Sequence, residues 1–593
     1  MRYMKEILRK NKTWVLAYLS IGIFNAFMAN YKADCFQGIV DGLTQRTITI
    51  YGILLYGVVL VLNYGMNYLD EYPTAKLANE IYLDFKLLAL QKISRMDYAE
   101  YQKLGTGKLV QQIENGANAG KGVLYNFWFC VVRQLVPTIF FSLFFIWKID
   151  QKITCFLLAG YIIVFIVTNL LLKGLYQIKE KILTNEEQLN HYLVRGFMEM
   201  PVFRMKKQFP NEMKRASGAK RIIVASKVKM TMIHEAFFTI FALLVACLDV
   251  GILLYAWNNS QLSVGAVVAL ISLIDNAYTP IAIFNVIYIQ YKLDKTAWKR
   301  FAGLLDLKED RQLQEGGMFH AFSHEIRVEN VSFSYGNIVI DNKIDSKNIL
   351  NHVNLTIRKG EKVAFVGESG SGKSTLAKIL IGLLKYESGE ILIDDKPLRK
   401  LSLESLYEKV SYLSQDTPVF DGTIRENLVF DNKFSDNKFS DDALRASLEA
   451  TQLLPLLESL DSGLDTRIGE KGTCLSGGEK QRLALARLWF DHAEIVILDE
   501  ATSALDNVTE SIVMKNVLAQ VNDAAVIAIA HRLASIRDFD KIYVFREGGI
   551  VGSGTFAELL EKNAYFQELY QKEKDLSGDT WTKNQNEKTT LSI

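Results

Sequence analysis

Long apolar runs fill the first half of the chain, with polar segments between them. Each run is close to the ~20 residues that a helix needs to cross the hydrocarbon core of a bilayer. A soluble all-helical domain is the alternative, but it would not need so many runs of this length. We therefore expect six membrane spans, at about residues 14–30, 51–69, 123–147, 153–172, 233–257 and 264–290.

Basic residues gather in the segments that the six spans would leave on one side of the membrane. Residues 1–12 are rich in Lys and Arg, and so is the segment 173–232, whereas the opposite connections are short and sparsely basic. Positively charged loops stay in the cytoplasm. The pattern predicts a multi-pass protein of the cytoplasmic membrane with both termini in the cytoplasm.

The two long inner segments, residues 70–122 and 173–232, keep helical apolar spacing far beyond the expected spans. We expect helices that continue into the cytosol and turn back near residues 96–107 and 196–204, where helix breakers and aromatic residues occur. Each turn is interpreted either as a docking element for the second half of the chain or as a simple loop tip.

Four charged residues fall within or at the edge of the expected spans: Arg133, Glu235, Asp249 and Asp275. At ~1.5 Å of rise per residue, Asp249 lies roughly 12 Å, Asp275 roughly 16 Å and Arg133 about 21 Å from the outer surface, while Glu235 is near the inner one. Charges at membrane depth are costly and indicate functional sites. The alternative is an intramembrane ion pair that holds helices together.

The second half of the chain has the patterning of a soluble domain. We expect a transmembrane domain over residues 1–307, a polar linker over 308–324, a soluble domain over 325–570 and a disordered polar tail over 571–593. Residues 431–440 are a tandem duplication of five residues, expected in a surface loop, to which no chemistry is assigned.

Composition narrows the possible partners. The 593 residues carry a net charge of only +2, which gives no indication of nucleic-acid binding. The five cysteines are scattered, without the spacing of a metal site, and we expect free thiols. The N-terminus lacks a small-residue cleavage site, so no removable signal peptide is predicted.

A phosphate-binding loop is predicted where the apolar residues 362–366, read as a buried strand, precede the helical spacing of residues 376–384. Such a loop directs backbone N–H groups and a helix N-terminus at one anion. Lys373 would reach the β- and γ-phosphates, and Ser374 would ligate Mg²⁺. The motif consists of Gly367, Glu368, Ser369, Gly370, Ser371, Gly372, Lys373, Ser374 and Thr375.

Two further motifs follow. Residues 495–500 form an apolar strand that ends in Asp499 and Glu500; in a phosphate-loop enzyme such an aspartate completes the Mg²⁺ shell and such a glutamate polarises water. A glycine-rich turn before it opens a second helix that could bind an anion. Two phosphate-binding helix starts in one chain are natural if two copies bind head to tail. The second start comprises Ser476, Gly477, Gly478 and Glu479.

These motifs, in this order, resemble the nucleotide-binding domain of an ABC transporter, and six preceding spans resemble its exporter-type half-transporters. The resemblance covers about residues 10–570 and implies an all-α six-helix transmembrane domain followed by an α/β P-loop (RecA-like) domain with a helical subdomain. The residues that carry it are Tyr335, the loop 367–375, Gln415, the segment 475–482, Asp499, Glu500, the segment 503–506 and His531.

The resemblance also implies roles for single residues. Tyr335 would stack on adenine, Gln415 would join Ser374 and Asp499 around Mg²⁺, and His531 would contact the γ-phosphate. Glu500 would be the general base. Ser476, Gly477, Gly478, Glu479 and Asp506 would serve the interface with a second half-transporter, in a homodimer or a heterodimer.

The function that this resemblance implies is ATP-driven export of an amphipathic drug, lipid or peptide. If Arg133 pairs with one of Asp249 and Asp275, an acid is left over in each subunit, so we expect an acidic cavity that prefers cationic compounds. An importer with the exporter fold, for example for siderophores, a non-transport ABC ATPase, and a regulatory membrane subunit remain alternatives.

Overall fold

The structure is a computed structural model in which the chain forms two compact units, Met1–Ser94 with Leu104–Leu307 and Arg95–Lys103 with Lys308–Ile593. It describes residues 2–577 except 105, 199, 259–261, 336–337, 341–342, 346–347, 416–417, 430–438, 470–471, 473 and 531. The side chains of residues 106–108, 162–174, 176, 198, 282, 285, 338–340, 343–345 and 576–577 are likewise not described.

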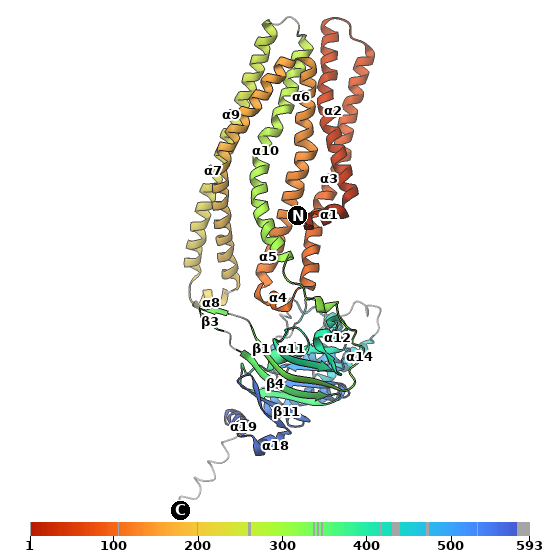
Figure 1. Ribbon diagram of the computed structural model, residues 1–593, viewed down its shortest axis with the longest axis vertical. Coiled ribbons are helices and arrows are strands. Elements are labelled where there is room, and N and C mark those ends of the chain that lie inside the picture. The colour runs from red at the N-terminus through yellow and green to blue at the C-terminus, as the bar shows by residue number, and fades with distance from the viewer. Residues whose placement is uncertain are drawn as a thin grey trace, which may run out of the picture. The chain divides into compact units, whose positions relative to one another are not determined.

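The first unit is helical, and its long helices run side by side in Figure 1. Its elements are α1 (Arg2–Lys10), α2 (Lys12–Thr44), α3 (Ile50–Ser94), α5 (Thr106–Lys121), η1 (Gly122–Phe129), η2 (Val131–Leu135), α6 (Val136–Ile149), α7 (Gln151–Met198), α8 (Met200–Met205), α9 (Phe209–Asn258) and α10 (Val264–Leu305).

Five helical stretches among the described residues are long and apolar enough to cross a membrane: Lys12–Thr44, Ile50–Ser94, Leu109–Ile149, Phe209–Asn258 and Val264–Leu305. Large apolar side chains such as Leu54, Val61 and Leu254 are exposed along them, as lipid contact requires. The other predicted span, residues 153–172, falls within α7, and the side chains from residue 162 onward lie outside the described residues.

The helices continue well beyond a bilayer, as the apolar spacing predicted. At ~1.5 Å per residue, a helix of 50 residues is about 75 Å long, more than twice the ~30 Å hydrocarbon core. Helix α9 has 50 residues and α7 has 48, and the chain turns between them at α8. The turn predicted near residues 196–204 is therefore present.

Arg133 has a different partner from the two that the sequence suggested. Its guanidinium forms an ion pair with Asp70, one residue beyond the second predicted span, and not with Asp249 or Asp275. The prediction overlooked Asp70 because α3 continues without interruption past the expected membrane boundary. Asp249 lies within electrostatic reach of Asp275, which is exposed in the single chain.

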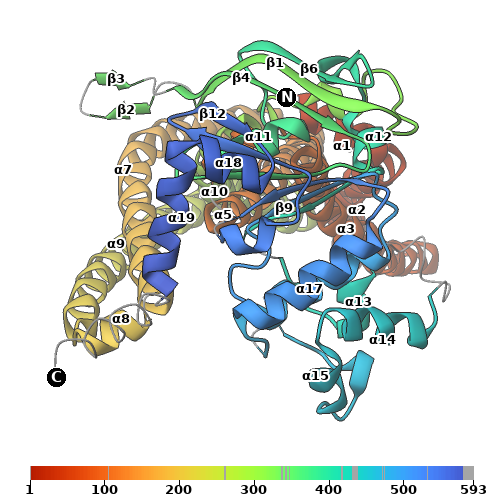
Figure 2. The same ribbon diagram turned by 90° about the horizontal axis from the view of Figure 1, so that it is seen from below.

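The second unit is built on two sheets. A six-stranded sheet has the order β12-β11-β5-β10-β9-β8, parallel except for β12, and a four-stranded antiparallel sheet has the order β4-β1-β6-β7. In Figure 2, β4, β1 and β6 lie side by side. The strands are β1 (Glu325–Ser334), β4 (Asn348–Arg358), β5 (Lys362–Gly367), β6 (Ser388–Ile393), β7 (Lys396–Pro397), β8 (Val410–Leu413), β9 (Ile495–Asp499), β10 (Ala525–Ile529), β11 (Lys541–Arg546) and β12 (Gly549–Gly554). A separate hairpin pairs β2 (Ile338–Ile340) with β3 (Lys343–Asp345).

Helices cover the parallel sheet, so its central strands are buried on both faces and read as continuous apolar runs. All residues of β9 and β10 are buried. One apolar core joins both sheets with the helix after β5, and another joins the opposite face to the C-terminal helices. The helices are α11 (Lys373–Leu380), α12 (Leu403–Tyr407), α13 (Ile424–Leu428), α14 (Asp441–Ala450), α15 (Leu454–Glu458), α16 (Gly477–Ala486), α17 (Asn507–Gln520), α18 (Phe556–Lys562) and α19 (Ala564–Ser577), with short 3₁₀ turns at Arg311–Leu313, Leu398–Lys400, Gly463–Asp465, Arg487–Trp489 and Leu533–Ile536.

The helices α13 to α16 form a subdomain with its own apolar core, which includes Leu428, Leu444, Leu457 and Leu483. The predicted helical subdomain is therefore present. Residues 431–438 of the predicted duplicated loop lie outside the described residues.

The first inner turn, α4 (Tyr98–Leu104), belongs mostly to the α/β unit although the sequence places it between two long helices. The Asp97 N–H donates to the Lys308 carbonyl at 3.1 Å, and the Asp310 N–H donates to the Arg95 carbonyl at 2.9 Å. The Tyr98 ring packs against the core of the two sheets. The docking interpretation is confirmed for this turn.

The C-terminal boundary differs from the prediction. Helix α19 runs to Ser577, so residues 571–577 are helical and not part of a disordered tail. The reason is an anchor that the polar composition concealed: the Glu573 carboxylate accepts hydrogen bonds from the Leu533 N–H at 2.8 and 3.1 Å. Residues 578–593 lie outside the described residues.

Candidate functional site

Parallel strands bring the predicted motifs to one edge of the sheet. The register pairs Asp499 at the end of β9 with Ile529 at the end of β10, and Ile529 with Phe365 near the end of β5. The carboxyl ends of parallel strands form the crevice in which open α/β sheets bind ligands. The glycine loop after β5 and the two carboxylates after β9 therefore share one crevice.

The glycine loop has a backbone that side chains would disturb. Gly372, immediately before α11, has φ +102°, and a Cβ there would come within 2.6 Å of the Leu350 side chain and 2.8 Å of the Ile349 carbonyl. Only glycine adopts this conformation without strain. The loop consequently leads into α11 with the backbone N–H groups of its first turn available to an anion.

Lys373 is buried beneath this loop. Its ammonium donates to the carbonyls of Gly367 at 2.8 Å and Glu368 at 2.9 Å and to the Ser371 hydroxyl at 3.3 Å. Burial lowers the pKa of Lys373, while the nearby carboxylates of Glu500 and Asp499 act in the opposite direction. A cation held by loop carbonyls and a hydroxyl can transfer these hydrogen bonds to phosphate oxygens.

Ser374 and Asp499 meet directly. The Ser374 hydroxyl donates to Asp499 Oδ1 at 2.7 Å, and the Tyr412 hydroxyl donates to Oδ2 at 3.1 Å. Asp499 is only 3% exposed, and burial followed by the charge of Asp499 raises the pKa of Tyr412. A serine hydroxyl beside a buried carboxylate is an oxygen donor set that suits Mg²⁺.

Glu500 stands next to this donor set in a strained backbone. Its φ is +54°, which is uncommon for a residue with a side chain and is typical of functional sites. Gln415 donates from its Nε2 to Glu500 Oε2 at 2.7 Å. The structure thus brings Lys373, Ser374, Gln415, Asp499 and Glu500 together, as predicted.

Two further residues, Tyr335 and His531, were predicted for this site. Tyr335 is 46% exposed, and its hydroxyl lies 3.3 Å from the Thr375 hydroxyl, so its ring borders the helix that follows the loop. An exposed ring at this position could stack on a base. His531 lies outside the described residues.

The second glycine-rich motif forms the N-terminus of α16. Ser476 accepts a hydrogen bond from the Glu479 N–H at 3.3 Å, and the Glu479 carboxylate accepts from the Ser476 N–H at 2.7 Å. This capping box lowers the pKa of Glu479, chiefly through the Ser476 N–H. Gly477 and Gly478 follow within the first turn, and a Cβ on Gly478 would lie 3.1 Å from the Ala504 carbonyl.

Gln481 joins this helix to the segment after Glu500, and sequence reasoning gave it no role. Its amide nitrogen donates to the Ser503 hydroxyl at 3.0 Å, and its carbonyl oxygen accepts from the Ala504 N–H at 2.8 Å. The same segment ends at Asp506, which caps α17 by accepting from the N–H groups of Val508 and Thr509. These backbone bonds lower the pKa of Asp506. The sequence feature that could have indicated this role is the polar side chain of Gln481, one helical turn after Gly477–Gly478.

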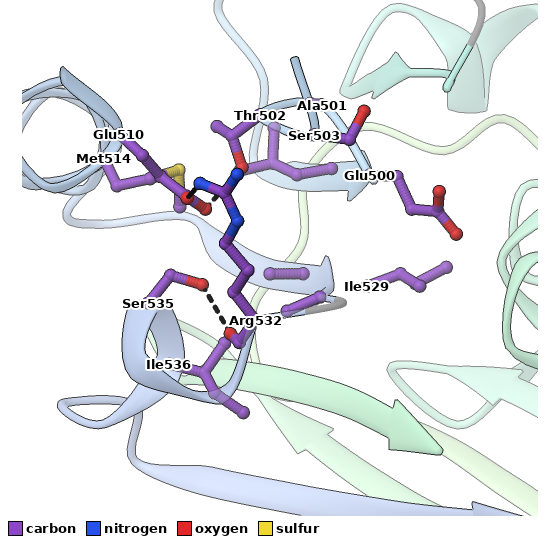
Figure 3. A pocket seen from close by; sticks show the side chains of 13 residues that line it. Glu500, Ala501, Thr502, Ser503, Glu510, Met514, Ile529, Arg532, Ser535 and Ile536 are labelled. Atoms are coloured by element: carbon purple, nitrogen blue, oxygen red, sulfur yellow. Dashed lines mark hydrogen bonds and ion pairs between the residues drawn. The ribbon is translucent and has the colours of Figure 1, made fainter. Parts of the chain in front are cut away.

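Behind Glu500 lies a small cavity that contains an ion pair not predicted from the sequence. In Figure 3 the side chains of Glu510 and Arg532 point toward each other, and they form an ion pair at 2.6 Å. The Thr502 hydroxyl donates to Glu510 at 2.8 Å, and Arg532 also donates to the Leu505 carbonyl at 2.9 Å. The pair therefore ties the segment after Glu500 to the residue after His531.

The chain is similar in sequence to known proteins of one family. Residues 350–503 match the family model described as ABC transporter. An uncharacterized ABC transporter ATP-binding protein of Bacillus subtilis is 34% identical over 350 residues, which cover 59% of this chain and 58% of that protein's length. An ATP-dependent lipid A-core flippase of Haemophilus ducreyi is 27% identical over 95% of this chain and 96% of its own length.

The fold is also similar to a solved structure. A bacterial Atm1-family ABC exporter with ATP bound superposes with a TM-score of 0.77, covering 95% of this chain and 98% of the exporter at 22% identity. At that identity the likeness concerns the fold, a helical domain followed by an α/β domain in one chain.

The Glu510–Arg532 pair generates a testable prediction. Replacing Glu510 with Ala removes the anchor of Thr502 and leaves the Arg532 guanidinium without its carboxylate, so Glu500 loses its fixed position. We expect a fall of about tenfold in kcat for ATP hydrolysis, or ~1.4 kcal/mol, with KM within about twofold. The Glu510→Ala/Arg532→Ala double variant should cost no more than either single change.

Glu568→Ala provides the matched control, since its ion pair with Lys572 at 2.8 Å is exposed on α19. That variant should hydrolyse ATP at the wild-type rate. Strictly additive losses in the Glu510 and Arg532 variants would show that the two residues act independently and that the pair does not position the segment.

Proposed function

Because this chain is an ABC transporter with the fold of the exporters, we propose that it exports an amphipathic compound across the cytoplasmic membrane at the expense of ATP. The observation that carries the proposal is the convergence of Lys373, Ser374, Asp499 and Glu500 at one sheet edge, in a chain that also contains apolar helices of membrane-spanning length.

In the proposed reaction, the glycine loop and Lys373 bind the β- and γ-phosphates of ATP, and Tyr335 stacks on the adenine. Ser374 and Gln415 would hold Mg²⁺, with Asp499 acting through water, and the ion would neutralise phosphate charge. Glu500 accepts a proton from the attacking water. The Gln415–Glu500 hydrogen bond at 2.7 Å supports this assignment, because it places both side chains at one position.

We further propose that two chains work as a dimer. Ser476 and Gly478 open α16 at a helix start distinct from the one that follows the glycine loop, and Ser476 keeps its hydrogen bonds within its own helix. In a head-to-tail dimer, each such start completes the nucleotide site of the other subunit. ATP binding then clamps the two α/β domains together, and hydrolysis releases them.

The proposed substrate class has less specific support than the proposed ATP hydrolysis. The likeness to ATP-dependent lipid A-core flippases extends over most of the chain, which favours a lipid-like amphipathic compound. The exporter fold favours outward movement over import. The long apolar helices disfavour an ABC ATPase without a membrane function.

Hydrolysis can be tested at Glu500. Glu500→Gln keeps the shape of the side chain but cannot accept a proton, so the variant should bind ATP with near wild-type affinity and lose turnover by at least about a hundredfold. Lys373→Ala should instead weaken ATP binding itself. Binding is measured with a fluorescent ATP analogue and turnover by phosphate release. Turnover of Glu500→Gln within a few-fold of wild type would exclude Glu500 as the base.

Assembly across the dimer can be tested with mixed subunits. A dimer that combines one Lys373→Ala chain with one Ser476→Arg chain has one site with both lesions and one site with neither, if Ser476 serves the partner's nucleotide. We expect measurable ATPase activity in purified mixed dimers and none in either variant homodimer. If each site is formed within one chain, both sites are damaged and the mixed dimer is as inactive as the homodimers.

The acidic pair in the helical unit gives a prediction about cargo. Arg133 is engaged with Asp70, so both Asp249 and Asp275 are left to attract a cation. Replacing both with Asn should reduce the stimulation of ATPase by cationic amphipathic compounds at least about tenfold relative to neutral ones. An unchanged ratio in a folded double variant would mean that the two aspartates do not contribute to cargo selection.

A further inference from the structure

A cavity of about 470 Å³ with both polar and apolar lining residues opens within the helical unit between α2, α3, α10 and residues 130–138. Asp70 and Arg133 are the charged residues in its lining, so the formal charge of the lining is zero. The remaining polar side chains are amides, hydroxyls and one thiol. The amides and hydroxyls belong to Asn25, Asn67, Gln134, Thr138, Asn276 and Thr279.

The ion pair in this cavity is held in place by three helices. Arg133 binds Asp70 of α3, its Nη1 lies 3.5 Å from the Thr74 hydroxyl, and its guanidinium lies 3.9 Å from the centroid of the Tyr18 ring of α2. Gly22 provides the space, because a Cβ there would collide with the Arg133 side chain. The side chains of Arg133 and Asp70 are only 15% and 16% exposed.

The pair leaves hydrogen-bonding capacity unused. Among the described residues, Asp70 Oδ1, Arg133 Nε and Asn25 Oδ1 are buried without a hydrogen-bond partner. A buried polar atom without a partner costs ~1–3 kcal/mol, so such atoms are rarely left in pairs or triplets. These two acceptors and one donor belong to three residues that line the cavity, so a ligand that separates Asp70 from Arg133 could offer them both donors and acceptors.

The backbone around the cavity is irregular as well. The third membrane-spanning segment is π-helical over Gly122–Phe129 and Val131–Leu135, which includes Arg133. Pro280 of α10 has no N–H to donate to the carbonyl of Asn276. π-Helical turns occur frequently at functional sites, and irregular backbone at membrane depth is tolerated where it lines a cavity.

We propose that this cavity binds the headgroup of the exported compound and that this headgroup is zwitterionic. Arg133 takes the anionic group and Asp70 the cationic group, and the amides bind the remaining polar atoms. A ligand with a single charge would engage one partner and leave the other buried and unpaired, which is strongly destabilising. A ligand with both charges replaces both halves of the ion pair. That the bound compound is exported rests on the proposed function. The binding itself does not.

The cavity is separate from the acidic pair. Asp249 and Asp275 are not among its lining residues. The acidic pair selects for positive charge alone, whereas the Asp70–Arg133 pair selects for opposite charges on one molecule. The two sites therefore predict different rankings of the same set of compounds.

The test uses three compounds with the same chain length. 2-Aminotetradecanoic acid carries an ammonium and a carboxylate, tetradecylamine carries only the ammonium, and tetradecanoate carries only the carboxylate. Binding to the full-length protein in lipid nanodiscs is measured without nucleotide by tryptophan fluorescence, and ATPase stimulation is measured separately. We expect the zwitterion to bind at least about tenfold more tightly than either singly charged compound.

Variants assign the effect to the cavity. Arg133→Gln and Asp70→Asn should each remove the preference for the zwitterion, and Gly22→Ala should weaken zwitterion binding by displacing Arg133. The charge-exchanged variant Asp70→Arg/Arg133→Asp should recover part of the preference. The matched control is Asp34→Asn/Lys148→Gln, which removes an ion pair at 2.9 Å between α2 and α6; neither residue lines the cavity, so this variant should change nothing.

The outcomes separate the inference from the export proposal. Zwitterion binding that depends on Arg133, without ATPase stimulation or transport, supports the site and contradicts export of such compounds. Equal binding of the three compounds, or a preference unaffected in Arg133→Gln, overturns the inference even if another compound is exported. If the single variants do not fold, the charge-exchanged variant and Gly22→Ala show whether the cavity prefers the zwitterion.

Discussion

The parallel register of β5, β10 and β9 is the constraint on which the nucleotide site depends. It fixes Gly367, Ile529 and Asp499 at one edge, so that a loop and two carboxylates far apart in the sequence meet. The hydrogen bond between Ser374 and Asp499 at 2.7 Å follows from this register. A shift by one residue would turn every side chain to the opposite face and separate the pair.

Buried charge is compensated differently in the two units. In the α/β unit the buried Lys373 and Asp499 bind loop carbonyls and hydroxyl groups, and they can exchange these contacts for a ligand and its ion. In the helical unit, Arg133 and Asp70 are largely withdrawn from solvent and bind each other. The second arrangement is expensive because both ions lose hydration, and a ligand that binds both charges, as proposed, would offset part of that cost.

How well the sequence predicted the structure depends on how far apart along the chain the interacting residues lie. The glycine loop, the strand ending at Asp499 and the long apolar helices are local patterns, and all were predicted. Three interactions join residues 22 to 63 positions apart, and no periodic pattern in the sequence predicts them. They are the Asp70–Arg133 pair, the Glu510–Arg532 pair and the hydrogen bonds that anchor α19 to Leu533. Asp70 was missed because membrane boundaries were placed by hydropathy, while the helix itself continues to Ser94.

Helix α4 lies between two long helices in the sequence, but it belongs mostly to the unit that contains the nucleotide site. Two backbone hydrogen bonds join residues 95–97 to the start of the α/β unit at residues 308–310, and Tyr98 packs against the core that joins the two sheets. That core contains Val363 and Phe365 of β5 and Ile497 of β9, the strands that lead into the glycine loop and Asp499. Because packed cores have low compressibility, the position of α4 depends on the position of the strands that lead into the nucleotide site.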